Sequence, residues 1–230
     1  MNRLAWGLAL GVVLLLAALA GLLFGSVRVA PAVVVEVIAA RLMGASPSDS
    51  TASTIIWSLR LPRVVLAFAV GGGLAVVGVG MQALVRNPLA EPYLLGVSSG
   101  ASAGASLFYL GFLPPLLSTA LSLPLAAFLG ALIAMVLVVL VAREGSYLPT
   151  ARLLLAGVAL SALFAAVTAF VTFASPDADR MRVVLFWLLG SFSGAQWATL
   201  WLPLGTAVGG TALLWLVARP LDALLTGEDA

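Results

Sequence analysis

The sequence contains no histidine, no cysteine and no lysine, so all eleven of its basic residues are arginines. Without cysteine the chain has no disulfide, no thiolate nucleophile and no sulfur ligand for a metal. Without histidine and lysine it has no imidazole base, no Schiff-base amine and no phosphate-binding loop of the Walker type. These absences exclude most kinds of enzyme before any motif is considered.

Charge is also scarce. Only 9% of the 230 residues are charged, whereas 63% are apolar, and a soluble domain carries roughly 25% charged residues. The net charge of +2 is too small to form a basic patch. The composition therefore excludes a soluble globular protein, a disordered chain and a nucleic-acid-binding protein, and it predicts a protein of the lipid bilayer.

Long uncharged runs predict the membrane spans, because about 20 apolar residues cross the hydrocarbon core. The first run has 24 uncharged residues, more than the roughly 7–15 of a signal-peptide core, which favours a span over a cleaved leader. Pro114 and Pro115 interrupt the run 92–142 and predict a turn within it. We expect an all-α polytopic bundle with six spans, near 4–27, 64–85, 93–112, 118–142, 153–176 and 197–218.

The longest polar segment is 28–63. Its part Val33–Met43 is amphipathic, with Glu36 and Arg41 among apolar residues, which predicts a helix lying in the membrane interface. The stretch 46–54 is rich in Ser, Thr, Pro and Asp and predicts a loop. A short half-helix is expected before the softer stretch Gly190–Gln196.

No aspartate, glutamate or arginine falls inside the six predicted spans. Proton-coupled carriers use a buried ionisable group to load and unload the proton, so this class is disfavoured. A sodium-driven carrier that uses neutral oxygens remains open. If the chain takes part in transport, we expect another subunit to supply the energy.

Residues Gly96–Gly100 match G-x-S-x-G, the nucleophile elbow of serine hydrolases. That chemistry needs a base beside the serine, and the chain has neither histidine nor lysine to act as one. An intramembrane aspartyl protease is excluded as well, because no predicted span holds an aspartate. The many small residues here serve either close helix packing or a bend beside a pathway.

The loop from Arg86 to Pro92 contains two prolines, which force a non-helical break between two spans. Arg86 and Glu91 flank this break at the membrane surface. Two interpretations remain open: a plain turn with charged anchors, or a fixed constriction at one end of a pore.

Five segments stand out along the chain: RLPR at 60–63, MQALVRNPLAEPYLLGVSSGA at 81–101, RLLLAGVAL at 152–160, FWLLGSFSGAQW at 186–197 and RPLDALLTGEDA at 219–230. Together, and in this order, they closely resemble one family, the permease subunits of bacterial ABC importers for iron-siderophores, haem and vitamin B12. The resemblance covers most of residues 55–230.

The resemblance implies a multi-pass permease domain over residues 1–230 in the bacterial plasma (inner) membrane, with no ATPase site, cofactor or metal of its own. Its implied partners are a second permease subunit in a homo- or heterodimer, cytoplasmic ATP-binding subunits and a periplasmic or lipid-anchored substrate-binding protein. Five arginines on one side of the membrane against six on the other do not decide the orientation. The resemblance places both termini in the cytoplasm and 28–63 outside.

The resemblance also implies roles for individual residues. Arg60 and Arg63 are the candidates for docking the binding protein, with interfacial anchoring as the alternative. The cytoplasmic gate would be formed by Asn87, Leu89, Thr150 and Ala151. The candidates that line the pathway are Ser161, Thr168 and Thr172, although hydroxyls in a span also bond back to their own helix.

The family normally continues through cytoplasmic coupling helices and further spans to roughly ten in all. We therefore expect this chain to be C-terminally incomplete, as a truncated product, a fragment or half of a split permease. An iron-siderophore is the favoured cargo, and haem and cobalamin remain open. The alternative functions are an ion-coupled secondary carrier and a structural membrane subunit.

Overall fold

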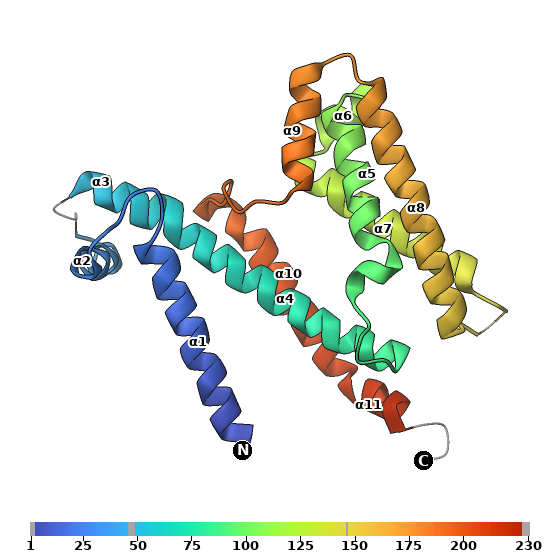
Figure 1. The fold of residues 1–230 in the computed structure, drawn as a ribbon, viewed down its shortest axis with the longest axis horizontal. Coiled ribbons are helices and arrows are strands. Elements are labelled where there is room, and N and C mark those ends of the chain that lie inside the picture. Colours follow the sequence, from blue (N-terminus) through green and yellow to red (C-terminus); the bar gives the residue numbers. More distant parts are fainter. Residues whose placement is uncertain (1–2, 46–48, 146, 227–230) are drawn as a thin grey trace. The chain divides into compact units, whose positions relative to one another are not determined.

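The chain folds as a set of α-helices in the computed structural model, which describes residues 3–45, 49–145 and 147–226. Over these residues there is no β-strand, only an isolated bridge between Glu144 and Tyr147. The predicted all-α class is confirmed (Figure 1). The elements are α1 Arg3–Leu23, α2 Pro31–Leu42, α3 Ser50–Ser53, η1 Thr54–Arg60, α4 Leu61–Val85, η2 Pro92–Leu95, α5 Val97–Tyr109, α6 Pro115–Ala120, α7 Leu123–Ala142, α8 Thr150–Ala174, α9 Ala178–Leu188, α10 Trp197–Leu216 and α11 Ala218–Thr226.

Within the described residues, five helices are long and apolar enough to cross a membrane: Leu4–Leu23, Ser50–Val85, Leu123–Ala142, Thr150–Ala174 and Trp197–Leu216. They coincide with five of the six predicted spans. The sixth, near 93–112, is different, because α5 has only 13 residues. Gly96 has a φ of 72° and separates η2 from α5, so the apolar run is divided by a left-handed residue that only glycine adopts without strain.

The helix that contains the second span begins earlier than expected. Asp49 caps it by accepting hydrogen bonds from the backbone N–H groups of Thr51 and Ala52, at 2.8 and 3.0 Å. The helix then runs without a break through α3, η1 and α4, which together we call the long helix. The predicted loop at 46–54 is therefore wrong from Ser50 onward, because an N-cap turns the Ser/Thr-rich stretch into a first helical turn; residues 46–48 lie outside the described residues.

The contacts divide the chain into two units, which we describe separately. The first comprises Met1–Leu74 and Phe192–Leu213. Its buried apolar cluster joins the end of α1 to α2 and the start of the long helix through Leu22, Val34, Val37, Ala52 and Ile56. Helix α2 exists as predicted, with Val34 and Val37 buried in this cluster. Its position at the membrane interface, and that of 28–63 outside the membrane, remain predictions.

The second unit comprises Ala75–Ser191 and Leu214–Ala230. Helices α5, α7 and α8 pack together in it through small residues. A Cβ built on Gly100 would lie 2.5 Å from the carbonyl oxygen of Gly130, and one on Gly157 would lie 3.1 Å from the Cα of Leu95. Backbones approach this closely only where at least one of the two facing residues is as small as glycine.

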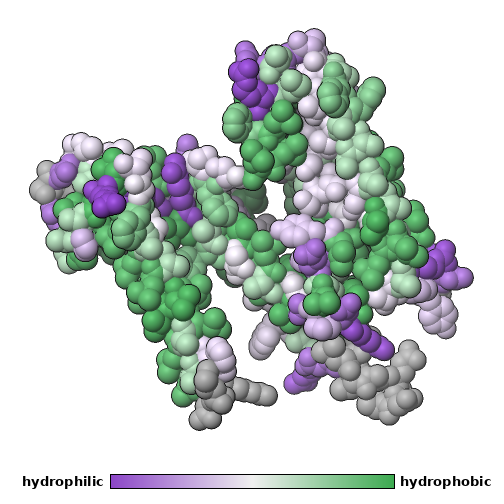
Figure 2. Space-filling model, viewed as in Figure 1, coloured by the Kyte–Doolittle hydropathy of each residue, from purple (hydrophilic) through white to green (hydrophobic). Residues whose placement is uncertain are grey.

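Large apolar side chains remain exposed along the long helices. On α1, Leu8 is 64% exposed and Leu15 is 61% exposed, and Figure 2 shows the visible shaft of this helix as mostly apolar. In water such a surface would drive aggregation, whereas in a bilayer it faces the acyl chains. The exposure therefore agrees with a multi-pass membrane protein.

Candidate functional site

The predicted gate loop begins where α4 ends. The N–H of Arg86 donates to the carbonyl of Ala83, and the N–H of Asn87 donates to the carbonyl of Gln82. These two bonds form a Schellman motif, which terminates a helix by placing one residue in the left-handed conformation. That residue is Arg86, with a φ of 53°, and among the described residues it is the one non-glycine with positive φ. An arginine at this position is strained by about 1 kcal/mol relative to glycine.

Asn87 shapes the turn that follows. Its side-chain oxygen accepts a hydrogen bond from the N–H of Leu89 at 2.9 Å, and its carbonyl accepts one from the N–H of Ala90 at 3.1 Å. This Asx turn leaves Leu89 85% exposed at the loop tip and buries Ala90 to 4% exposure. The amide of Asn87 is thus a conformational element of the loop, and Leu89 is its exposed apolar tip.

A cavity of about 610 Å³ lies beside this loop in the second unit. Its walls come from the last turns of α4, from the loop itself and from residues at the end of α10 and in α11. The polar side chains that line it are those of Gln82, Arg86, Asn87 and Asp222. The cavity is therefore mostly apolar, with both signs of charge among its lining side chains.

The other predicted gate residues, Thr150 and Ala151, form the first turn of α8. Thr150 is half-buried and Ala151 is exposed. Just beyond them Arg152 pairs with Glu144 at 2.6 Å, which ties the start of α8 to the loop before it. Among the described residues that line the 610 Å³ cavity, Asn87 is present and Thr150 and Ala151 are not.

A second cavity, of about 570 Å³, lies among α5, α8 and α9. Two of the three predicted pathway residues, Thr168 and Thr172, line it from α8. Three serines face it from α5: Ser98, Ser99 and Ser102. No charged side chain is among its described lining residues, so hydroxyl groups provide its side-chain polarity.

Ser161, the third predicted pathway residue, has a different environment. Its hydroxyl oxygen lies 3.1 Å from where a Cβ on Gly96 would be, so it packs against the left-handed break before α5. It is not among the residues that line the 570 Å³ cavity in the described part of the chain. That Ser161 lines a pathway therefore remains a prediction.

The hydroxyls of α8 also bond to their own helix. Ser161 donates to the carbonyl of Gly157 at 2.7 Å, Thr168 to that of Phe164 at 3.0 Å and Thr172 to that of Thr168 at 2.7 Å. This i to i−4 bond uses the hydroxyl proton and leaves the oxygen lone pairs as acceptors. Thr168 and Thr172 therefore present acceptor oxygens to the cavity.

The three serines of α5 were not proposed as pathway residues from the sequence. Ser98 and Ser102 are four residues apart and so share a helix face, and this spacing was the available signal. The same stretch matches G-x-S-x-G, and the structure gives the residues of that motif roles in packing and in lining the cavity. Gly100 packs against α7, while Ser98 and Ser99 face the cavity.

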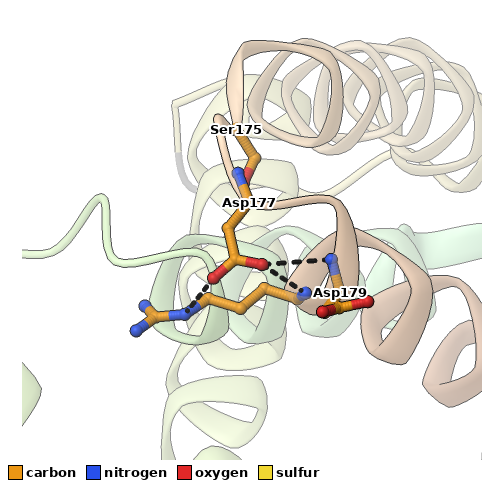
Figure 3. Close-up of polar contacts among 4 residues, drawn as sticks. Ser175, Asp177 and Asp179 are labelled. Atoms are coloured by element: carbon orange, nitrogen blue, oxygen red, sulfur yellow. Dashed lines mark hydrogen bonds and ion pairs between the residues drawn. The ribbon is translucent and has the colours of Figure 1, made fainter.

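Helix α9 closes the third side of this cavity with Met181, Leu185 and Leu188. Asp177 caps the N-terminus of α9 by accepting hydrogen bonds from the N–H groups of Asp179 and Arg180, both at 3.0 Å (Figure 3). The same carboxylate pairs with the guanidinium of Arg180 at 3.1 Å. The predicted half-helix before Gly190 is thus a capped helix of 11 residues.

The predicted docking residues lie in the first unit. Arg60 is 8% exposed, and its guanidinium donates to the carbonyls of Leu22 at 2.6 Å and Leu23 at 3.2 Å and also to that of Val27. Arg63 is half-buried and donates to the carbonyl of Ser193 at 3.2 Å. The guanidinium of Arg60 is therefore buried among backbone acceptors, and docking by either arginine remains a prediction.

Among the residues that the structure describes, no three aspartate or glutamate side chains come together in a way that could hold a metal ion. Neither cavity therefore has the ligand set of a metal centre. The structure instead contains two cavities that few charged side chains line.

Comparison with known proteins gives consistent findings. The model of the FecCD transport family matches residues 13–230. The cobalamin import system permease protein BtuC of Halobacterium salinarum is 39% identical over 186 residues, which are 78% of this chain and 47% of that protein. The vitamin B12 import system permease protein BtuC of Escherichia coli is 37% identical over 232 residues, which are 99% of this chain and 64% of that protein.

A solved structure of a metal-chelate type ABC transporter in an inward-facing conformation superimposes with a TM-score of 0.76 at 26% identity. The match covers 96% of this chain and 64% of the other chain. This chain thus spans between 47% and 64% of the length of these three proteins.

Proposed function

The chain belongs to the FecCD transport family, and we propose that it is a permease subunit of an ABC importer in the bacterial inner membrane. A second permease subunit would complete the pathway, separate ATP-binding subunits would supply the energy, and a substrate-binding protein would deliver the cargo. The proposal is supported by the family match, by the relatives that import cobalamin, and by five helices of membrane-spanning length and composition in the described residues.

The observation that carries the proposal is the 570 Å³ cavity among α5, α8 and α9. The hydroxyl oxygens that line it can form successive hydrogen bonds with a large hydrophilic cargo. None of them is charged, so none forms an ion pair with the cargo. Conduction requires binding that is weak enough for the cargo to leave again. The serines of α5 with Thr168 and Thr172 fit that requirement better than an ion-binding centre, which would need a tight cage of oxygens.

The proposed gate combines the loop tip at Leu89 with the first turn of α8 at Thr150 and Ala151. Exposed apolar side chains at a constriction close a pore by excluding water. The Asx turn of Asn87 holds Leu89 at the tip, so the two residues would act as one device. For docking, Arg63 is the proposed contact of the pair, because the donors of Arg60 are directed at backbone carbonyls.

The proposed cargo is a metal chelate. The names of the relatives favour cobalamin, whereas the sequence alone favoured an iron-siderophore. Both are large hydrophilic molecules that a cavity lined by hydroxyls can accept. Uptake of radiolabelled cyanocobalamin and of a ferric siderophore into vesicles that contain the assembled transporter would decide between them.

Thiol labelling tests the pathway, because the chain has no cysteine of its own. In the assembled transporter, a water-soluble thiol reagent should modify Thr168→Cys and Ser102→Cys, and bound cargo should slow the reaction. Phe170→Cys is the matched control, since Phe170 is 70% exposed on the same helix and is proposed to face lipid. Equal labelling of all three variants, or cargo uptake without an ATP-binding subunit, would refute the proposal.

A further inference from the structure

Arg60 occupies an unusual position for a cation that is expected at a protein surface. It ends η1, where the long helix passes beside the end of α1, and it is 8% exposed. Figure 1 shows the two helices meeting at this end of the first unit. No carboxylate pairs with it among the ion pairs of the described residues. A buried charge without a counter-ion must be stabilised by other polar groups.

Those groups are two carbonyls at the C-terminus of α1 and one in the turn that follows it. One guanidinium nitrogen donates to both Leu22 and Leu23, and the other terminal nitrogen donates to Val27. The last four carbonyls of a helix lack partners within it and carry the negative end of the helix dipole. A planar cation with several donors satisfies both needs at once.

Gly25 provides the space that this arrangement requires. A Cβ at Gly25 would lie 2.9 Å from Nη2 of Arg60, 3.3 Å from its Cζ and 3.5 Å from its Nε. The guanidinium therefore occupies the space that a side chain at position 25 would fill. A Cβ at 25 would require the guanidinium to shift.

Other contacts place the same end of α1 in the core. Leu22 is buried in the cluster with Ile56, which lies one turn before Arg60 in η1. The N–H of Phe24 donates to the carbonyl of Ala20, and the N–H of Val29 donates back to that of Leu23. The turn that leads from α1 to α2 thus wraps around the guanidinium.

We infer that Arg60 is a positioning residue that closes the C-terminus of α1 and fixes the turn 24–30 against the long helix. It holds the segment that leads to α2 in place. A lysine cannot replace it, because a single ammonium on a flexible stem lacks the rigid fork that spans three carbonyls. The inference concerns the fold of this segment and is independent of the proposed transport function.

Hydrogen exchange of the purified chain in lipid nanodiscs tests this role at the amides of Phe24 and Val29. Losing hydrogen bonds to a charged group should speed their exchange by about 10- to 100-fold in Arg60→Gln. Arg60→Lys should behave like Arg60→Gln, although it keeps the charge. Arg63→Gln is the matched control and should exchange like the wild type, since Arg63 donates to Ser193 instead.

Gly25→Ala tests the same contact from the other side and leaves Arg60 in place. It should also speed exchange at Phe24 and Val29. The double variant with Arg60→Gln should exchange no faster than the faster single variant, because both changes remove one interaction. Wild-type exchange in Arg60→Lys, or in both Arg60→Gln and Gly25→Ala, would overturn the inference.

Discussion

Gly100 holds α5 against α7, and its replacement by alanine is the sharpest test of the helix packing in the second unit. A Cβ at Gly100 would lie 2.5 Å from the carbonyl oxygen of Gly130 and would overlap the Cβ of Ala134. Ordinary contact begins at 3.4 Å, so the two helices must separate locally by the difference, about 0.9 Å. Neither obstacle is the flexible end of a side chain, so the backbone itself has to move.

The expected cost follows from two opposing effects. Overpacking a tight interface costs about 1–3 kcal/mol, whereas replacing a helical glycine by alanine gains roughly 0.5–1 kcal/mol. We expect Gly100→Ala to lose about 1–2 kcal/mol of stability in total. For a chain of this length, that loss lowers the unfolding midpoint by about 2–8 °C.

The assay is thermal unfolding of the purified chain in detergent, followed by the fluorescence of its six tryptophans. Gly209→Ala is the matched control, because Gly209 lies within α10 and a Cβ there would meet nothing within 4 Å. The control should be as stable as the wild type or slightly more stable. If Gly100→Ala unfolds at or above the temperature of this control, α5 and α7 do not approach as closely as described.

Three further predictions concern single contacts. Arg86→Gly should raise the stability by about 1 kcal/mol, because glycine adopts the positive φ of this position without strain. Asp177→Ala should cost about 1 kcal/mol and speed hydrogen exchange in the first turn of α9, because it removes the N-cap. Glu144→Gln should cost less than about 1 kcal/mol, since the partner Arg152 is 46% exposed.

Each of these has its own control. Arg86→Ala keeps the backbone strain, so equal stabilities of the alanine and glycine variants would contradict the first prediction. Asp177→Asn keeps the cap and loses only the charge, so it should exchange more slowly than Asp177→Ala, and equal rates would count against capping. The effect of Glu144→Gln should shrink in high salt, and a loss that salt leaves unchanged would argue against an ion pair.

The sequence predicted the membrane helices well because composition and run length depend on neither packing nor partners. Five of the six predicted spans coincide with helices of sufficient length. The prediction failed at α5, where Gly96 divides an apolar run, and at Ser50, where the cap provided by Asp49 starts a helix in a stretch rich in serine and threonine. In both places one residue decides the backbone, and hydropathy does not register it.

The candidate site was likewise predicted only in part. Thr168 and Thr172 were named as pathway candidates from the sequence, and both line the second cavity. The serines of α5 were recognised only as small residues, because periodicity within one helix does not say which neighbouring helix faces it. Arg60 was expected at the surface for the same reason, since the carbonyls that surround it belong to a helix nearly forty residues earlier in the sequence.

What the sequence determined by itself is the class of protein and much of its chemistry. The absence of histidine, cysteine and lysine excluded most catalytic sites, and the scarcity of charge placed the chain in the bilayer, because both depend only on which side chains exist. The tertiary structure alone decided which hydroxyls share a cavity, which glycines bring backbones together and whether an arginine is presented or buried. These properties depend on distances between segments that are remote in sequence, and only folding sets such distances.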